Sequence, residues 1–204
     1  LVNKGLEVMQ KLNNPGLRAL AEKTNIKQKV SVYDLGFKLG PRINAAGRLG
    51  RSSFGTDLLT ANQKLIADQI SEELNKFNSE RRTIESYVLD QAIEQVTEDK
   101  LKNKVLIVYG EGWHEGVIGI IASRLKDKFN KPTIVLSITD DVAKGSGRSL
   151  KGIDLGSLVV AAQQSQIILK GGGHAMAAGL TMEKNKIDKL SQFFEKKLNK
   201  VDAI

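Results

Sequence analysis

The spacing of apolar residues predicts one long helix in the middle of the chain. Residues 56–105 contain no glycine or proline. Apolar side chains recur there at spacings of three, four or seven residues, as on one face of an amphipathic helix: Ile66, Ile70, Leu74, Phe77, Ile84 and Val88. A helix of roughly 40 residues would be about 60 Å long at 1.5 Å per residue, longer than a typical globular helix. We therefore expect a connector between two domains, which could break near Thr83.

The second half of the chain alternates short apolar runs with helical patterns. The runs at 105–109 and 133–137 are typical of buried strands, and residues 117–129 between them have helical spacing. A strand, a helix and a second strand within about 33 residues match a βαβ unit with a right-handed crossover. The fold class expected from this pattern is α/β.

Further elements are expected on both sides of this unit. After it, strands are expected at 142–150 and 177–182, a helix at 155–164 that Asp154 caps, and a final amphipathic helix at 186–200. Before the long helix, residues 1–22 indicate one or two helices broken by a turn at Asn13–Gly16. Residues 27–39 tolerate a strand, because apolar and polar side chains alternate from Val30 to Tyr33.

Composition narrows the class of protein. The 204 residues suffice for one or two domains, and no apolar run approaches 18 residues, so we expect no membrane span. The absence of cysteine excludes disulfides and thiol nucleophiles and is compatible with a cytoplasmic protein. The net charge of +8 favours an anionic partner, nucleic acid first, over an ordinary basic protein. A first residue that is Leu suggests a fragment.

The most distinctive stretch is K-G-G-G-H-A-M-A-A-G-L, from Lys170 to Leu180. Because consecutive glycines carry no Cβ, their backbone N–H groups can converge on an anion of the size of a phosphate. Lys170 and His174 flank the glycines and add a charge and a polar hydrogen. The alternative is a glycine turn between a strand and a helix, with a histidine in the core.

Other polar residues occur in similar glycine-rich frames. In L-G-P-R-I-N-A-A-G-R-L-G, Arg42 and Arg48 are suited to phosphate, or they tie down helix ends in a structural turn. Ser146 and Arg148 in G-S-G-R-S present a hydroxyl and a guanidinium on exposed backbone. The two histidines, His114 and His174, are expected to contact phosphate or substrate. Core histidines remain an alternative, and a metal site with Glu111 or Glu115 fits no known zinc spacing.

Four motifs in this order resemble the RecJ family, bacterial exonucleases specific for single-stranded DNA. They are L-G-P-R-I-N-A-A-G-R-L, G-W-H-E-G-V-I-G-I-I-A-S-R-L, G-S-G-R-S and G-G-G-H-A-M-A-A-G-L. The last resembles the signature of the DHHA1 domain, which DHH phosphoesterases and alanyl-tRNA synthetases share. The resemblance implies a mixed-sheet DHHA1 domain with flanking helices at 101–204, a long connecting helix at 56–100, and the tail of a DHH domain at 1–55.

The resemblance also implies a function. RecJ-like enzymes hydrolyse phosphodiester bonds from the five-prime end during DNA repair and recombination, with two Mn²⁺ or Mg²⁺ ions held by the DHH domain. This sequence contains no D-H-H triplet and no D-x-D pair. We therefore expect the metal ligands and the catalytic residues outside this chain, which alone would be inactive. Single-stranded DNA is the expected partner, with a helicase or a single-strand-binding protein, in the cytoplasm and without a membrane.

The expected contacts to substrate and phosphate are Arg42, Asn44, Arg48, His114, Glu115, Ser146, Arg148, Gly171, Gly172, Gly173 and His174. Two other functions stay open. One is a DHH-type phosphoesterase that acts on short oligonucleotides or cyclic dinucleotides. The other is a non-catalytic module that binds nucleic acid.

Overall fold

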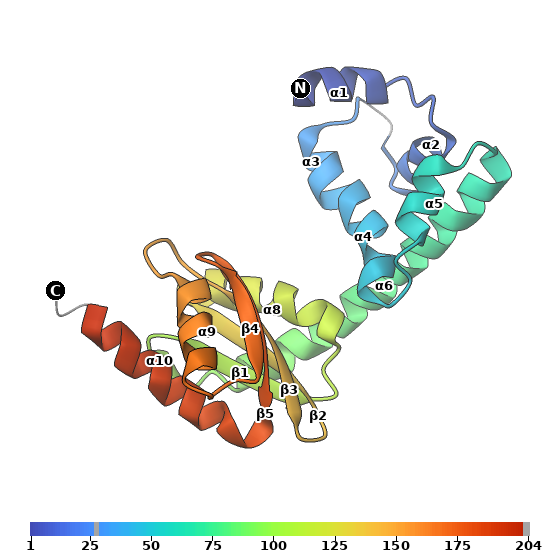
Figure 1. Cartoon of the computed structure of the whole chain (residues 1–204). Helices are drawn as coiled ribbons and strands as arrows, with labels where there is room; N and C mark the ends of the chain where they lie inside the picture. Colours follow the sequence, from blue (N-terminus) through green and yellow to red (C-terminus); the bar gives the residue numbers. More distant parts are fainter. Residues whose placement is uncertain (27–28, 202–204) are drawn as a thin grey trace. The chain divides into compact units, whose positions relative to one another are not determined.

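The computed structural model describes residues 1–26 and 29–201 and divides into two compact units, residues 1–83 and 84–204 (Figure 1). The described part of the first unit is helical. Its elements are α1 (Val2–Met9), α2 (Pro15–Lys23), α3 (Val32–Asp34), a π-helical turn (Leu35–Leu39), α4 (Gly40–Arg48), α5 (Phe54–Thr60) and the first part of α6 (Lys64–Glu94). Its buried core consists of Leu20, Val30, Leu39, Ala46, Leu58 and Leu74.

The expectation of a strand-tolerant segment is wrong from Val32 to Leu39, which is helical; residues 27–28 lie outside the described part. Ser31 and Asp34 form a capping box, in which Asp34 N donates to Ser31 Oγ at 3.2 Å and Ser31 N donates to Asp34 Oδ2 at 3.0 Å. These two bonds satisfy backbone donors that a helix start leaves unpaired. The glycine-rich motif that follows is likewise a helix, α4, and not a turn.

The long helix is α6, which has 31 residues and is continuous through Thr83. It begins later than the pattern suggested, because α5 and a short connection precede it, and residues 98–102 form a separate helix, α7 (Glu98–Lys102). The division between the two units falls within α6, after Thr83. The helix therefore contributes to both units.

The second unit contains a five-stranded mixed sheet, as expected. Its strands are β1 (Leu106–Glu111), β2 (Thr133–Thr139), β3 (Val142–Arg148), β4 (Lys170–His174) and β5 (Ala177–Glu183), in the order β1-β2-β3-β5-β4. β1 and β2 are parallel and joined by α8 (Glu115–Phe129), which confirms the βαβ unit. The other neighbouring strands are antiparallel.

Helices cover both faces of this sheet (Figure 1). One face packs against α9 (Leu155–Gln164) and α10 (Ile187–Val201), with Met182 and Phe194 fully buried between them. The other face packs against α8 and the end of α6 over β1 and β2. Asp154 caps α9 as expected, since its Oδ1 accepts from Ser157 N at 3.0 Å.

Part of the G-W-H-E-G motif is explained by packing in this second core. Trp113 is buried, and its Nε1 donates to Gln91 Oε1 at 2.7 Å. A Cβ on Gly110 would lie 2.1 Å from the indole ring, so only glycine leaves room for it. The tryptophan of the motif and the glycine that precedes the motif by two residues therefore serve the core.

The three consecutive glycines form the edge strand β4, and not the loop expected from the sequence. A Cβ on Gly171 would lie 2.5 Å from Val159 Cγ1, and one on Gly173 would lie 2.3 Å from Ala177 O. A Cβ on Gly172 would meet no atom within 4 Å. Packing therefore demands glycine at Gly171 and Gly173, whereas Gly172 borders open space.

Candidate functional site

The alternation of side chains along β3 separates two sets of residues. Ala143 is buried in the core beneath α9 and α10, and Cβ atoms on Gly145 and Gly147 would meet Leu136 and Leu155 of that same core. Successive side chains of a strand point to opposite faces. Lys144, Ser146 and Arg148 therefore lie on the face that carries α8.

The register of the strands extends this set into three rows across β3, β5 and β4. Neighbours in the register share a face of the sheet, so each row runs across the face that carries α8. The rows are Arg148–Ala177–His174, Ser146–Gly179–Gly172 and Lys144–Thr181–Lys170. We call these nine residues the open face.

The open face is bounded on one side only. α8 packs along β2 and β3, and β4 ends the sheet. Gly179, Lys170 and His174 are exposed, and Gly172 and Thr181 are half-buried. Of the residues expected to bind phosphate, Ser146, Arg148, Gly172 and His174 belong to the open face, with β5 between the first two and the last two, whereas Gly171 and Gly173 face the other side of the sheet.

Arg148 and Ser146 form one polar unit beside α8. Arg148 Nη1 donates to Ser146 Oγ at 3.1 Å and to Gly147 O at 2.8 Å. A Cβ on Gly119 would lie 3.1 Å from Arg148 Nη2 and 3.1 Å from Ser146 Oγ, so the glycine lets α8 approach the guanidinium. A guanidinium oriented in this way presents N–H donors in the fixed fork that suits a phosphate.

Both histidines use Nδ1 as an acceptor from the backbone. His174 Nδ1 accepts from Met176 N at 3.2 Å, and His114 Nδ1 accepts from Gly116 N at 3.0 Å. In the neutral ring the hydrogen then lies on Nε2, which can donate to a ligand. His174 is exposed at the end of the first row, which excludes a core histidine. His114 is the N-cap of α8 and has a visible structural task.

Glu115 contacts a lysine that the sequence reasoning missed. Lys144 Nζ lies 2.8 Å from Glu115 Oε1 and 3.1 Å from Oε2. A carboxylate repels phosphate, so the geometry makes Glu115 a partner of Lys144. The signal was present in the sequence, because Lys144 precedes Ser146 by two residues in the same strand and therefore shares its face.

The motif in the first unit places its residues on α4. Arg42 is half-buried: its Nε donates to Asn75 Oδ1 at 2.9 Å and its Nη1 to Lys38 O at 2.8 Å. Burial and, to a lesser degree, the charge of Arg82 lower the pKa of the Arg42 guanidinium. The bond to Asn75 links α4 to α6. Arg42 therefore has the structural role that the sequence analysis gave as the alternative to binding phosphate. Asn44 and Arg48, four residues apart, are exposed on one side of α4.

Over residues 1–26 and 29–201, no three histidine, aspartate or glutamate side chains are grouped as ligands for a metal ion. These residues therefore hold no group that joins the two histidines with Glu111 or Glu115 as metal ligands, the arrangement that the sequence analysis set aside. No helix described there is long and apolar enough to cross a membrane.

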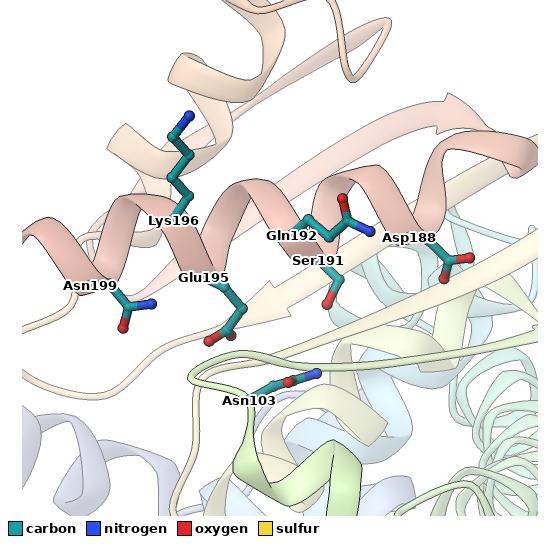
Figure 2. Close-up of a pocket in the computed structure, with 7 residues that line it drawn as sticks. All are labelled: Asn103, Asp188, Ser191, Gln192, Glu195, Lys196 and Asn199. Carbon is teal, nitrogen blue, oxygen red and sulfur yellow. The ribbon is translucent and has the colours of Figure 1, made fainter.

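A pocket of about 850 Å³ lies elsewhere in the second unit, between α10 and the turn before β1 (Figure 2). Asp188, Glu195 and Lys196 supply its charges, and Glu195 Oε1 accepts from Lys104 N at 2.6 Å. Two carboxylates against one ammonium make a poor site for an anion. None of the residues expected from the sequence lines this pocket.

Comparison with known proteins confirms the resemblance seen in the motifs. Residues 102–200 match the DHHA1 domain. The chain is 39% identical over 188 residues to the single-stranded-DNA-specific exonuclease RecJ of Dickeya dadantii, covering 88% of this chain and 33% of that protein. It is 34% identical over 189 residues to RecJ of Bacillus subtilis, covering 91% of this chain and 24% of that protein.

The fold is also similar to a solved structure. RecJ from Thermus thermophilus in complex with Mg²⁺ superposes with a TM-score of 0.87 at 28% identity, over 98% of this chain and 30% of that one. The chain therefore spans about a third or less of the length of these three RecJ proteins.

Proposed function

We propose that this chain, which resembles RecJ proteins along most of its length and carries a DHHA1 domain at residues 102–200, is the part of a single-stranded-DNA-specific exonuclease that binds nucleic acid and phosphate. The observation that carries the proposal is the row formed by Arg148 and His174, with the Ser146 hydroxyl bonded to Arg148. It presents a guanidinium, an imidazole and a hydroxyl on one exposed side of a sheet. These are donors that suit a phosphate.

Each group has a distinct task in this proposal. Arg148 and Ser146 hold the five-prime phosphate, and His174 donates to one of its oxygens through Nε2. Gly172, which has no side chain, lets the strand approach the sheet. The backbone of Gly171 to Gly173 was expected to contact phosphate. In this proposal only Gly172 borders the DNA, because glycine is needed at Gly171 and Gly173 for the packing of β4.

The motif of the first unit contributes less directly. Asn44 and Arg48 contact the DNA backbone from α4, and Arg42 positions that helix through Asn75. His114 caps the start of α8, and Glu115 is paired with Lys144 and has no contact with the phosphate in this proposal. The domain assignment belongs to the same proposal: residues 1–55 as the tail of a DHH domain, 56–100 as the connector and 101–204 as DHHA1, with the match at 102–200 supporting the last.

Hydrolysis from the five-prime end needs groups that the described residues do not supply. Solved RecJ structures from Thermus thermophilus contain Mg²⁺ or Mn²⁺. We infer that the ligands for such an ion lie outside this chain and that this chain contributes binding and orientation. We place the intact enzyme in the cytoplasm, acting in DNA repair and recombination; a helicase or a single-strand-binding protein as its partner stays a prediction.

The geometry favours a polymer over a small ligand. A phosphoesterase for short oligonucleotides or cyclic dinucleotides would enclose its ligand in a concave pocket, as small-molecule sites do. Apart from His174, which also lines a pocket of about 350 Å³ beside the start of α9, the residues assembled here form a face that is open at the edge strand β4. A long single strand can lie across such a face and continue beyond it.

The test is fluorescence anisotropy of this chain with labelled single-stranded DNA that carries either a five-prime phosphate or a five-prime hydroxyl. We expect tighter binding of the phosphorylated strand and loss of that preference in Arg148→Ala. Lys189→Ala, an exposed lysine on α10 at the opposite side of the sheet, is the matched control and should keep the preference. Equal binding of both strands by the unaltered chain would refute the proposal for this chain.

A further inference from the structure

The third row of the open face, Lys144–Thr181–Lys170, has no task in the proposed function. It lies four residues along the strands from the row of Arg148 and His174. At about 3.4 Å per residue the Cα atoms of the two rows are about 13–14 Å apart. The row between them contains Ser146, Gly179 and Gly172 and no charged side chain.

The charged groups at the two ends of β3 are held apart. Lys144 Nζ is fixed by Glu115 at 2.8 Å, toward the start of α8. Arg148 Nη1 is fixed by Ser146 Oγ and Gly147 O. Lys144 is therefore held by a carboxylate at the start of α8, and Arg148 by Ser146 of the middle row and by its neighbour's carbonyl, so the two cations have different partners.

The distance between the rows sets a minimum length for a ligand that uses both. Six covalent bonds separate neighbouring phosphorus atoms of a nucleic acid, so at about 1.5 Å per bond their separation stays below about 9 Å. Adjacent phosphates are therefore closer together than the Cα atoms of the two rows. The first and third phosphates of a strand can occupy the two rows, with the middle nucleotide above the glycines of the second row.

We propose that Lys144, Thr181 and Lys170 form a second phosphate subsite, which makes the open face select five-prime-phosphorylated strands of at least three nucleotides. The inference rests on the proposed function, because it assigns the terminal phosphate to Arg148. The strand then runs from Arg148 toward Lys144, antiparallel to the chain direction of β3. Gly179 and Gly172 leave the space that the middle nucleotide needs, since Gly179 has only Gly145 O, at 3.8 Å, near an added Cβ, and Gly172 has nothing within 4 Å.

Two carboxylates near this subsite affect its strength. Glu115 shares Lys144 with the incoming phosphate and so opposes binding. Glu183, at the next position of β5 on this face, is paired with Lys186 at 3.0 Å. Removing the charge of Glu115 should therefore release Lys144 for the phosphate, whereas Glu183 is already neutralised by its own partner.

The experiment measures binding of five-prime-phosphorylated oligothymidylates of one to six nucleotides, each with a three-prime label. For the unaltered chain we expect a step in affinity between two and three nucleotides. The double variant Lys144→Gln/Lys170→Gln should lose at least tenfold in affinity for three or more nucleotides and keep the affinity for one and two, which also shows that it is folded. Its salt dependence should fall by the slope of about 0.7 that one phosphate contact gives on a single strand.

Further variants separate the possible failures. Glu115→Gln should tighten binding of three or more nucleotides about twofold to threefold, with no change for one or two. Loss of affinity at every length in Arg148→Ala, combined with an unchanged double variant, overturns the second subsite and leaves the proposed function intact. Equal losses at all lengths in the double variant would indicate unspecific attraction and also overturn the subsite. An Arg148→Ala variant that binds every length normally would overturn the proposed function itself.

Discussion

Arg42 and Arg148 are half-buried arginines in glycine-rich motifs, one in each unit, and they differ in what they contact. Arg42 donates to Asn75 of α6 and to the carbonyl of Lys38, so its bonds join two helices. Arg148 donates to Ser146 and to the carbonyl of its own neighbour Gly147, on an exposed part of a sheet. The contacts of Arg42 therefore join two helices, whereas those of Arg148 stay within β3, where we propose that it binds phosphate.

The two units also differ in net charge. The first, residues 1–83, has 14 lysines and arginines against 8 aspartates and glutamates, a net charge of +6, whereas the second, residues 84–204, has 17 against 15, a net charge of +2. Most of the excess charge therefore lies outside the unit that carries the open face. We infer that the first unit supplies most of the long-range attraction for an anionic strand, beside the contacts proposed for Asn44 and Arg48, and that the second supplies the preference for a five-prime phosphate.

The largest expected change in stability follows from removing the guanidinium of Arg42. Arg42→Ala should lower the free energy of unfolding by about 1.5–3 kcal/mol, because Asn75 and the Lys38 carbonyl lose a charged hydrogen-bond partner. The preference for a five-prime phosphate should remain. Urea unfolding monitored by circular dichroism measures the first quantity and anisotropy the second. The neighbouring exposed Arg82, changed to alanine, should alter stability by less than about 0.5 kcal/mol.

Two glycines of β4 should likewise differ, one affecting stability and the other binding. Gly171→Ala should destabilise the chain by about 1–3 kcal/mol, because its Cβ would overlap Val159 and Ile168 in the core. Gly172→Ala should leave the unfolding free energy within about 0.5 kcal/mol and should weaken binding of phosphorylated DNA instead. Equal effects of both changes in thermal unfolding would contradict the assignment of Gly172 to the open face.

The strand formed by these glycines could not be predicted from the sequence. Three glycines in succession favour turns locally, and only pairing with β5 and contact with α9 turn them into a strand. By contrast, the βαβ unit and the cap at Asp154 depend on local spacing and were predictable. Lys144 could also have been found, since the alternation that joins Ser146 to Arg148 includes it.

The misread segment in the first unit has a similar explanation. Alternating apolar and polar residues around Val32 favoured a strand, but Ser31 and Asp34 stand three residues apart, the spacing of a capping box. This capping-box spacing was a local signal for the start of a helix, and it should have been given more weight than the short alternation of apolar and polar residues. The separate start of α6 at Lys64 had no such signal.

The capping box also predicts how acid affects the first unit. Bonds from Lys38 and Ser31 lower the pKa of Asp34 to about 2, below its ordinary value of 3.8. Because the folded state holds this carboxylate ionised, its contribution to stability is complete above about pH 4 and is lost as the pH falls through about 2. The stability difference between the unaltered chain and Asp34→Asn should therefore shrink over that range. A constant difference from pH 5 to pH 2 would argue against the capping box.

The smallest expected effect concerns attraction at long range. Arg82→Gln removes one exposed charge from the first unit, near enough to Arg42 to affect its pKa. It should slow association with single-stranded DNA by less than about twofold at low salt, and the difference should vanish as screening shortens the range of the field. Stopped-flow anisotropy at increasing salt measures this rate. The five-prime-phosphate preference should not change, because we assign it to Arg148. A changed preference would mean that Arg82 of the first unit also affects binding of the terminal phosphate.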